Sequence, residues 1–310
     1  MPTSSSNFAR LFQAAFARES ISSPFTEVEQ FRALMRAFAS LKPKFYLEEF
    51  HGFKRQVYFD TSYPWQRSRA RCELCDVLLI VYSTTGGFSM RMTLLQAKLS
   101  RAIHNTGLLA LAGQVEPQEF KGNFEQWNLL SARPQLIATT VFDPPPDLLS
   151  GALLPSVGTF GVFHQLNSGP VDLFYTSADC LLPTTLPPGP DSRIGKLSTV
   201  HGKVALRTIG PWTEVTYCPS ALDFARSLYE LSIGTPVVFE SSASGRTEYQ
   251  PHFNWVRGVL ASHIAVSGAN STIARALLSD LGSLVNLPDP SKVPSLVVLR
   301  SDTLVDGVRG

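Results

Sequence analysis

The segment Val77–Tyr82 constrains the fold most, because its six successive apolar residues suit a β-strand that is covered on both faces. It is far shorter than the roughly 18 apolar residues that a membrane-spanning helix needs. Gly86 and Gly87 follow, and glycine supplies the positive φ angles of a tight turn. The chain then returns through Phe88–Leu99. We therefore predict a β-hairpin at the centre of a sheet whose two faces are both buried.

Segments around this hairpin predict a mixture of helices and strands. Thr26 and Glu29 have the spacing of a helix capping box, and apolar residues repeat at helical intervals up to Pro43, which predicts a helix over 27–41. The other predicted helices are Phe124–Ala132, a helix that opens at Ser220 and ends at Gly234, and 271–286. The other predicted strands are Gln135–Phe142, Gly158–His164, Val171–Tyr175 and Leu296–Leu299. This pattern favours an α/β fold: a mixed β-sheet flanked by helices, with an additional α+β C-terminal half.

The chain length of 310 residues allows one large domain or two modest ones. Asp143–Asp147 contains three consecutive prolines, which suit neither a helix nor a central strand, so we take it as the boundary. The division is then a core over 1–147 and a C-terminal α+β extension over 148–310, with an extension continuous with the core as the alternative. The hydrophobic fraction of 44% and the charged fraction of 17% are typical of a globular protein and exclude a mainly disordered one.

The compartment is predicted from features that the sequence lacks. Residues 1–7 do not form the basic and then apolar run of a secretory signal, and no segment is long and apolar enough to span a membrane. Four cysteines are too few for a disulfide scaffold and fit a reducing cytosol. We therefore expect a cytoplasmic protein with no membrane partner. Lys and Arg total 27 against 25 Asp and Glu, so nucleic-acid binding would have to come from a local basic patch.

Polar residues that suit a catalytic site stand where the two strands of the hairpin meet. Asp76 directly precedes the apolar strand, and Gln96 and Lys98 end the returning strand, where residues two apart share a face. A turn centred on the middle of the glycine pair sets Asp76 opposite Ala97. A shift by half a residue, or one bulge, sets it opposite Gln96 or Lys98. Carboxylate and amide oxygens are hard ligands that suit Mg²⁺, and an ammonium group orients water or neutralises charge on a phosphate. These residues predict metal-assisted hydrolysis of a phosphodiester.

The order helix, strand with Asp76, strand with Gln96 and Lys98, helix, strand over residues 27–142 resembles the core of the PD-(D/E)XK nuclease superfamily. The Gln-x-Lys form is similar to that of Mrr-like restriction endonucleases. The resemblance implies a restriction-endonuclease-like fold. It also implies that Asp76 is the principal metal ligand, that Gln96 takes the place of the second acidic ligand, and that Lys98 is the catalytic lysine.

The acid that Gln96 replaces must be supplied elsewhere if the site is to hold a metal. Glu73 is close to Asp76 in the sequence and comes within reach where the strand entry is irregular. The glutamate that the first helix often contributes in the family corresponds to Glu29, or to Glu49 if the next segment continues that layer. The expected metal ligands are therefore Asp76, Gln96, Glu73 and Glu49, with Mg²⁺ or Mn²⁺ as the cofactor.

The function implied by this resemblance is that of a metal-dependent endonuclease, which hydrolyses DNA rather than RNA in bacterial restriction or anti-phage (antiviral) defence. A homodimer or a partner protein of a defence system is implied in the same way. The alternative is a catalytically weak or inactive nuclease-fold protein that acts as a nucleic-acid- or protein-binding subunit, because Gln96 lowers the charge available for metal. We expect exposed site residues, so that alanine at Asp76 or Lys98 abolishes cutting and changes stability by at most ~1 kcal/mol.

Residues 42–71 form a local basic segment, with seven Lys and Arg residues against three acids and with eight aromatic residues among them. Cations bind phosphates and exposed rings stack on unpaired bases, although many of these rings equally suit the core. Three arginines alternate with other residues and would point to one side of a strand, where a solvated edge is the other interpretation. The predicted nucleic-acid contacts are Arg67, Arg69, Arg71, Lys54, Arg55 and His104.

Two further motifs have less support. Cys72 and Cys75 have the spacing of half a zinc site, which Cys180 and Cys218 or a histidine would complete. Because no second Cys-x-x-Cys pair exists and both residues adjoin a buried strand, small core residues are the favoured interpretation. The sequence also lacks the motifs of P-loop nucleotide hydrolases, Rossmann dinucleotide-binding proteins and G-x-S-x-G esterases, so those classes have no support.

Overall fold

The computed structural model describes residues 4–41, 45–48, 55–61, 63, 66–104, 118–140, 142–185, 189, 192–199, 206–237, 251–267, 272–281 and 295–301. They form an α/β fold around an eight-stranded mixed sheet, in the order β1-β15-β4-β5-β7-β8-β13 with β14 paired to β5. The strands are β1 (Phe45–Glu48), β4 (Val77–Ser83), β5 (Ser89–His104), β7 (Gly158–Leu166), β8 (Val171–Ser177), β13 (Tyr217–Cys218), β14 (Thr235–Pro236) and β15 (Leu296–Arg300). Strands on both sides of residue 147 therefore belong to one sheet.

The predicted hairpin is confirmed as β4 and β5, and its register is now defined. The two strands pair antiparallel with Val77 opposite Leu95, so the turn is centred on Gly86 rather than on the middle of the glycine pair. Gly86 and the glycine after it have φ angles of +75° and +116°. Continued by one residue, this register places Asp76 opposite Gln96. The half-residue shift that the sequence left open is therefore the arrangement that the structure adopts.

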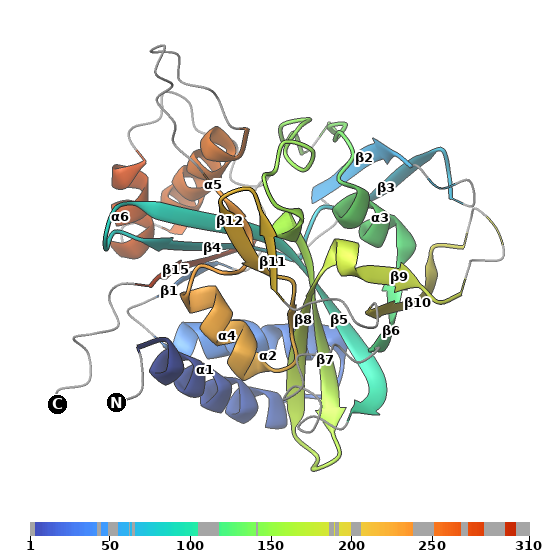
Figure 1. Cartoon of the computed structure of the whole chain (residues 1–310), viewed down its shortest axis with the longest axis horizontal. Helices are drawn as coiled ribbons and strands as arrows, with labels where there is room; N and C mark the ends of the chain where they lie inside the picture. The colour runs from blue at the N-terminus through green and yellow to red at the C-terminus, as the bar shows by residue number, and fades with distance from the viewer. Residues whose placement is uncertain are drawn as a thin grey trace.

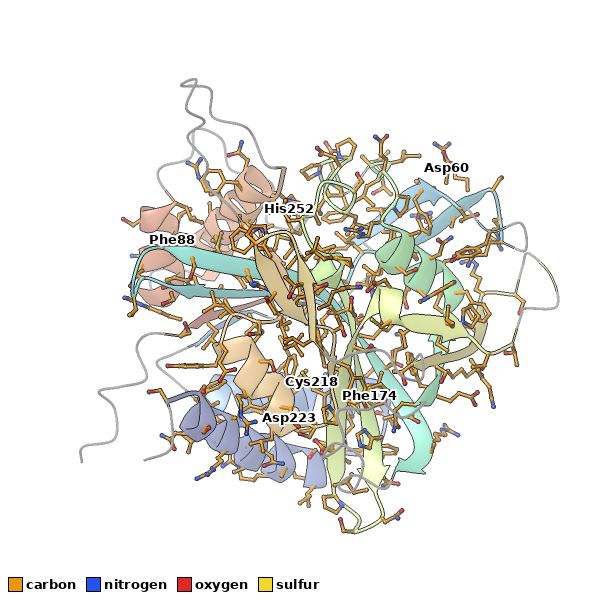
Figure 2. All side chains as sticks on the ribbon, viewed as in Figure 1. Asp60, Phe88, Phe174, Cys218, Asp223 and His252 are labelled. Carbon is orange, nitrogen blue, oxygen red and sulfur yellow. The ribbon has the colours of Figure 1, made fainter. Side chains whose placement is uncertain are left out.

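Both faces of the central sheet are covered, as the apolar strand predicts. Even-numbered residues of β4, such as Ile80, pack in one core with α3, α5 and α6, and odd-numbered residues, such as Leu79, pack in a second core with α1, α2 and α4. The helices are α1 (Ser4–Ile21), α2 (Glu27–Ser40), α3 (Phe124–Ala132), α4 (Ala221–Tyr229), α5 (Pro251–Ser267) and α6 (Thr272–Asp280). Figure 1 shows α1, α2 and α4 grouped on one side of the sheet, and Figure 2 shows side chains filling the space on both sides.

Three smaller sheets lie beside the central one within the described residues. They are formed by β2 (Gln56–Asp60) with β3 (Arg69–Glu73), by β6 (Glu119–Asn123), β10 (Ile194–Thr199) and β9 (Leu181–Pro183), and by β11 (Leu206–Ile209) with β12 (Trp212–Val215). Two short 3-10 helices, Pro155–Val157 and Ala178–Cys180, precede β7 and follow β8. The β6–β10–β9 sheet lies beside β5 and, as described below, forms one wall of a groove (Figure 1).

Two helices begin as the sequence predicts. The hydroxyl oxygen of Thr26 accepts a hydrogen bond from the Glu29 N–H at 3.3 Å, so α2 has the predicted cap. The Asn123 side chain caps α3 in the same way, and the bounds of α3 are those predicted. The sequence reasoning missed α1, although Phe8, Phe12 and Phe16 recur every four residues and are at most 1% exposed. That spacing is the signal that would have found it.

The predicted strand Gln135–Phe142 is wrong. Its described residues form an irregular loop whose only ladder contact is a single bridge between Ile137 and Tyr58. The Leu136 N–H donates to the Pro146 carbonyl at 2.7 Å, and the Thr139 N–H donates to the Phe142 carbonyl at 2.9 Å. Because the segment satisfies these backbone groups by folding back on the proline-rich segment, it does not extend along a neighbouring strand.

The last two helices that the sequence predicts are shorter in the structure. The helix that opens after Ser220 ends at Tyr229, and α6 ends at Asp280, with 282–286 outside the described residues. Gly234, predicted to end the first of these, has a φ angle of +87° in the turn before β14. A Cβ atom there would lie 2.4 Å from the Met92 carbonyl oxygen, so the glycine is required by the close approach of the chain to β5.

His164 of β7 makes stability depend on pH. Its side chain is 1% exposed, and burial lowers its pKa from 6.5 to about 4. The unfolded chain therefore binds the proton more tightly, so this stabilising contribution is complete above pH 6.5 and is lost as the pH falls towards 4. Against a His164→Leu variant, we expect the wild-type free energy of unfolding to fall by about 3 kcal/mol more over that range. Urea unfolding measures it, and parallel pH profiles of the two proteins would contradict the prediction.

Candidate active site

The structure brings together four of the predicted site residues, Glu73, Asp76, Gln96 and Lys98. Glu73 ends β3, and Leu74 and Cys75, both at most 1% exposed, anchor the short connection to β4. Asp76 is the last residue of this connection and is half-buried. The irregular entry into β4, which the sequence required for Glu73 to come within reach, is therefore present.

Asp76 is held against the returning strand by two backbone hydrogen bonds. Its N–H donates to the Leu95 carbonyl at 3.0 Å, and its carboxylate oxygen Oδ2 accepts from the Ala97 N–H at 2.6 Å. Ala97 is the residue between Gln96 and Lys98. The carboxylate therefore lies at the centre of the Gln-x-Lys motif, and these main-chain contacts help to fix its position.

The pKa of Glu73 reflects its burial and the charges around it. Burial, together with the negative charge of Asp76, raises the pKa of the Glu73 carboxyl to about 7, while Arg55 and Lys98 act in the opposite direction. The two carboxyl groups and the Lys98 ammonium group therefore act on one another within a single neighbourhood. Near neutral pH the Glu73 carboxyl is close to half protonated, so it can exchange a proton without a large free-energy cost.

Gln96 lies beneath these charges and is 0% exposed. Its Nε2 donates to the Glu73 carbonyl oxygen at 3.4 Å, whereas its buried Oε1 has no hydrogen-bond partner. An unpaired buried acceptor costs about 1 to 3 kcal/mol, so such an atom in a native structure calls for an explanation, for which a bound ion or water is one candidate. The amide oxygen is thus available as a ligand.

Lys98 contacts an acid that the sequence analysis did not select. Its Nζ lies 3.1 Å from the Glu27 Oε1, and the whole residue is only 8% exposed. Glu27 is the first residue of α2. The predicted helix glutamate Glu29 instead pairs with Arg32 at 2.7 Å, and Glu49 lies outside the described residues. The sequence could have indicated Glu27, because side chains in an α-helix tilt towards its N-terminus, and the first residue of a helix therefore points towards the segment before it.

The donor set fits a divalent metal such as Mg²⁺ or Mn²⁺. Glu73, Asp76 and the unpaired Gln96 oxygen are hard oxygen ligands, and a cation would relieve the repulsion that raises the pKa of Glu73. Within the described ranges, no group of three or more His, Cys, Asp or Glu side chains is placed to hold a metal. A metal held here would therefore have two carboxylates as ligands, with the Gln96 amide oxygen as the candidate third protein ligand.

The predicted nucleic-acid residues occupy different environments. Arg69 and Arg71 are exposed on one face of β3, with guanidinium carbons 5.9 and 5.2 Å from the centre of the Tyr58 ring of β2. Arg67 precedes β3, is half-buried, and its charge opposes the burial that raises the pKa of Glu125. The expected row of three arginines is therefore a row of two, because the strand begins at Arg69.

The other three predicted contacts differ again. Arg55 is 4% exposed, so it is placed to offset the charge of Glu73 rather than to reach outward to phosphate. His104 pairs through its backbone with Leu166 at the end of β5, and its side chain lies outside the described part of the structure, as does the whole of Lys54.

The cysteines of the Cys-x-x-Cys motif lie in the hydrophobic core. Cys72 and Cys75 are 4% and 1% exposed, and burial raises the pKa of both thiols. Cys180 and Cys218 are also buried, and all four cysteines are free. A raised thiol pKa opposes the thiolate form that zinc binds, so these positions suit small core residues.

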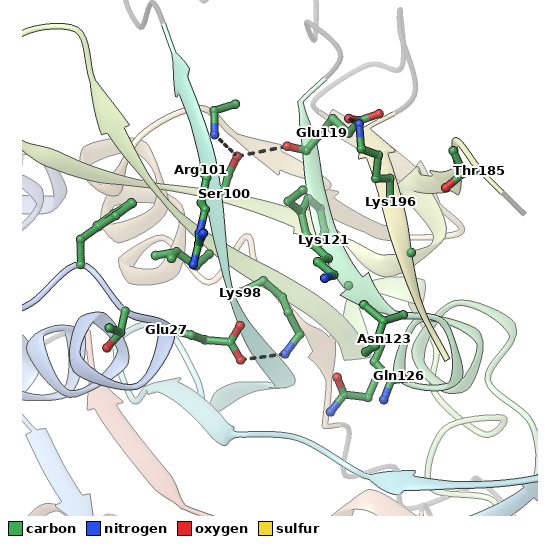
Figure 3. A pocket seen from close by; sticks show the side chains of 18 residues that line it. Glu27, Lys98, Ser100, Arg101, Glu119, Lys121, Asn123, Gln126, Thr185 and Lys196 are labelled. Carbon is green, nitrogen blue, oxygen red and sulfur yellow. Dashed lines mark hydrogen bonds and ion pairs between the residues drawn. The ribbon is translucent and has the colours of Figure 1, made fainter. Parts of the chain in front are cut away.

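A solvent-open groove of about 1170 Å³ has Lys98 among its lining residues. Its lining comes from the start of α2, the segment Lys98–Ala102 of β5, the whole of β6, α3 and the first half of β10. The pairing of β5 with β7 shifts register between Leu99 and Ile103, and such bulges redirect side chains. Figure 3 shows Lys98 and Lys121 pointing into this space from β5 and β6. We call it the basic groove, because its charged residues are Lys98, Arg101, Lys121 and Lys196 against Glu27 and Glu119.

Comparisons with known proteins add no relative. No family model matches the chain, and neither the curated proteins nor the solved structures include a significant match. Among the helices of the described residues, none has both the length and the apolar character required to cross a bilayer.

Proposed function

We propose that this protein is a metal-dependent endonuclease, with DNA as its substrate and with Asp76, Gln96 and Lys98 as its catalytic residues, in line with the resemblance to PD-(D/E)XK nucleases. One observation carries the proposal. The hairpin register places Asp76 opposite Gln96, and the Asp76 carboxylate is bonded at 2.6 Å to the N–H of the residue between Gln96 and Lys98. An acid, an amide and an amine are thereby held close together, and the amine, Lys98, also lines a groove that is open to solvent.

Each residue has a separate part in the chemistry. Asp76, Glu73 and the Gln96 oxygen would hold the metal, which supplies Lewis-acid polarisation of the phosphodiester and a more acidic bound water. The Lys98 ammonium group stabilises negative charge that develops on the phosphate. Glu27 holds Lys98 at 3.1 Å and so keeps its charge in the lining of the groove. Glu73, whose pKa of about 7 leaves it close to half protonated at neutral pH, would give up its proton on binding the metal.

A cleavage assay tests this function directly. Supercoiled plasmid, single-stranded DNA and RNA are incubated with the purified protein in Mg²⁺, Mn²⁺, Ca²⁺ or EDTA. We expect cutting of DNA in Mg²⁺ or Mn²⁺ and no cutting in EDTA. The absence of cutting of any substrate in any of the metals would refute the proposal.

Metal binding also has a readout that does not depend on cutting. At a Mg²⁺ concentration tenfold above its dissociation constant, we expect the free energy of unfolding to rise by about 1.4 kcal/mol, because the metal binds only the folded site. Asp76→Asn removes one of the two carboxylates but keeps an acceptor oxygen for the Ala97 N–H, so this increase should disappear in the variant. Urea unfolding with and without Mg²⁺ measures it, and an equal increase in both proteins would place the metal elsewhere.

A second candidate function is favoured by the burial of the motif. Gln96 is 0% exposed and Lys98 is already paired with Glu27, an arrangement that also suits a nuclease fold without efficient metal chemistry. Such a protein would act as a nucleic-acid- or protein-binding subunit. In the same assay it would bind DNA in a gel-shift experiment and cut in none of the metals.

We also propose the compartment, the biological role and the partners of this protein. All four cysteines are free, as expected in a reducing compartment, so we propose action in the cytoplasm. Bacterial restriction or anti-phage defence, with a homodimer or a defence-system protein as partner, follows from the resemblance. Infection of bacterial cells that express the wild-type protein or the Asp76→Asn variant tests this role, and equal phage growth in both would contradict it.

A further inference from the structure

The basic groove has one wall on which exposed lysines stand next to buried core residues. On β6, Phe120 is 3% exposed and faces the core, so Lys121 on the next position faces the groove. On the paired strand β10, Lys196 faces the groove while Leu197 is buried. This wall is therefore the solvent side of a small sheet, and the opposite wall is formed by β5 and the start of α2.

Two lysines stand directly opposite each other on this wall. The register of β6 with β10 pairs Lys121 with Lys196, and like charges at opposite positions destabilise a sheet. Glu119 compensates Lys196, with 2.6 Å between Nζ and Oε1. Arg101 and Lys98 add two further cations from β5. Lys98 is already paired with Glu27 at 3.1 Å, so the excess of positive charge lies at Arg101 and Lys121, and this excess points to an anionic ligand.

Apolar side chains lie among these cations. Ile194, which pairs with Asn123 on the groove wall, is 50% exposed, and Phe25 and Leu99 are half-buried in the lining. Cations that follow a phosphate backbone, together with apolar and aromatic surfaces for the bases, are typical of sites for unpaired nucleic acid. The volume of about 1170 Å³ exceeds the ~300 to 1,000 Å³ of pockets for small molecules, so it suits several linked nucleotides.

We propose that the basic groove binds a single strand of nucleic acid through Arg101, Lys121 and Lys196, and that it leads this strand to Lys98. The inference deepens the proposed nuclease function and rests on it for the identity of the site at Lys98. A duplex is a poor ligand for this groove, because its bases are stacked on one another and do not offer their faces to Phe25 or Ile194.

The test measures binding without cutting. Fluorescence anisotropy of a labelled 20-nucleotide single strand in EDTA compares the wild type, the double variant Arg101→Ala/Lys121→Ala and the control Arg10→Ala/Arg275→Ala. The control removes the same charge from exposed residues outside the groove, in α1 and α6. We expect the groove variant to bind roughly 10- to 30-fold more weakly at 0.1 M salt, with the slope of log K against log salt reduced by about 1.4, and the control to bind like the wild type.

Stability separates binding from folding. Lys121→Ala removes the like-charge pair, so its melting temperature should equal or exceed that of the wild type while its binding weakens. The inference is overturned if the groove variant binds the single strand as tightly as the wild type does, or if the control variant weakens binding equally. It is also overturned if the wild type binds a blunt-ended duplex as tightly as the single strand. If the wild type cuts DNA but the groove variant binds normally, the groove assignment fails and the nuclease stands. If groove-dependent binding occurs without cutting, the nuclease proposal fails and the groove stands.

Discussion

Replacing Lys98 by methionine should lower the rate of DNA cutting by about 10² to 10³-fold, because it removes the cation that stabilises charge on the reacting phosphate. Methionine retains much of the apolar stem that packs in this nearly buried position, where the residue is 8% exposed. The partner Glu27 has 45% of its side chain exposed and can be solvated when the lysine is lost, so stability should change little. Single-turnover cleavage kinetics measure the effect.

Glu27→Gln is the matched control for this prediction. It removes the same ion pair at 3.1 Å but leaves the Lys98 ammonium group, so any loss of rate should be much smaller than in Lys98→Met. If both variants lose activity equally, the loss of the ion pair, and not the loss of the lysine charge, accounts for the lower rate of cutting. If Lys98→Met cuts like the wild type, the catalytic assignment of Lys98 is wrong.

The site residues were expected to be exposed, so that replacing them would change the free energy of unfolding little. This expectation does not hold in the structure. Lys98 and Gln96 are buried, and the Asp76 carboxylate is the acceptor for the Ala97 N–H. Alanine at Asp76 would leave that backbone donor without its acceptor, at a cost of about 1 to 3 kcal/mol. For this reason Asp76→Asn is the better variant for separating catalysis from stability.

Replacing Arg207 by methionine should lower the free energy of unfolding by about 3 to 5 kcal/mol, the largest effect on stability that we expect. Arg207 of β11 lies opposite Glu214 of β12 and donates to it at 2.7 Å, and it also donates to Asp179 at 2.6 Å. Glu214 is 0% exposed and accepts a further bond from the Ser156 N–H. Loss of the guanidinium group would leave the buried Glu214 carboxylate without its hydrogen-bonded cation. Urea unfolding measures the change.

An exposed ion pair provides the control for Arg207. Arg32 lies 2.7 Å from Glu29 on the surface of α2, and breaking this pair by Arg32→Ala should cost no more than about 0.5 kcal/mol. A loss of similar size in both variants would show that burial of Glu214 does not govern the effect. Neither residue belongs to the candidate active site, so cutting should survive both changes.

The elements that the sequence predicted well depend on near neighbours. The apolar run of β4, the glycine turn and the Thr26 cap each follow from a few consecutive residues, and all three are present. The predicted strand at Gln135–Phe142 failed because β-branched composition says nothing about whether a partner strand is available. The row of three arginines became two because strand ends are set by pairing, and β3 begins at Arg69.

The sequence by itself therefore determined the hairpin, the helices α2 and α3, and the closeness of Asp76 to the Gln-x-Lys pair, because local backbone preferences and apolar periodicity decide such features. Only the tertiary structure decided the half-residue shift in the pairing of β4 with β5, the burial of Gln96, and the pairing of Lys98 with Glu27 rather than Glu29. It alone built the basic groove from β5, β6 and β10, segments far apart in the chain. Contacts between distant segments depend on packing across the whole fold, which no short stretch of sequence encodes.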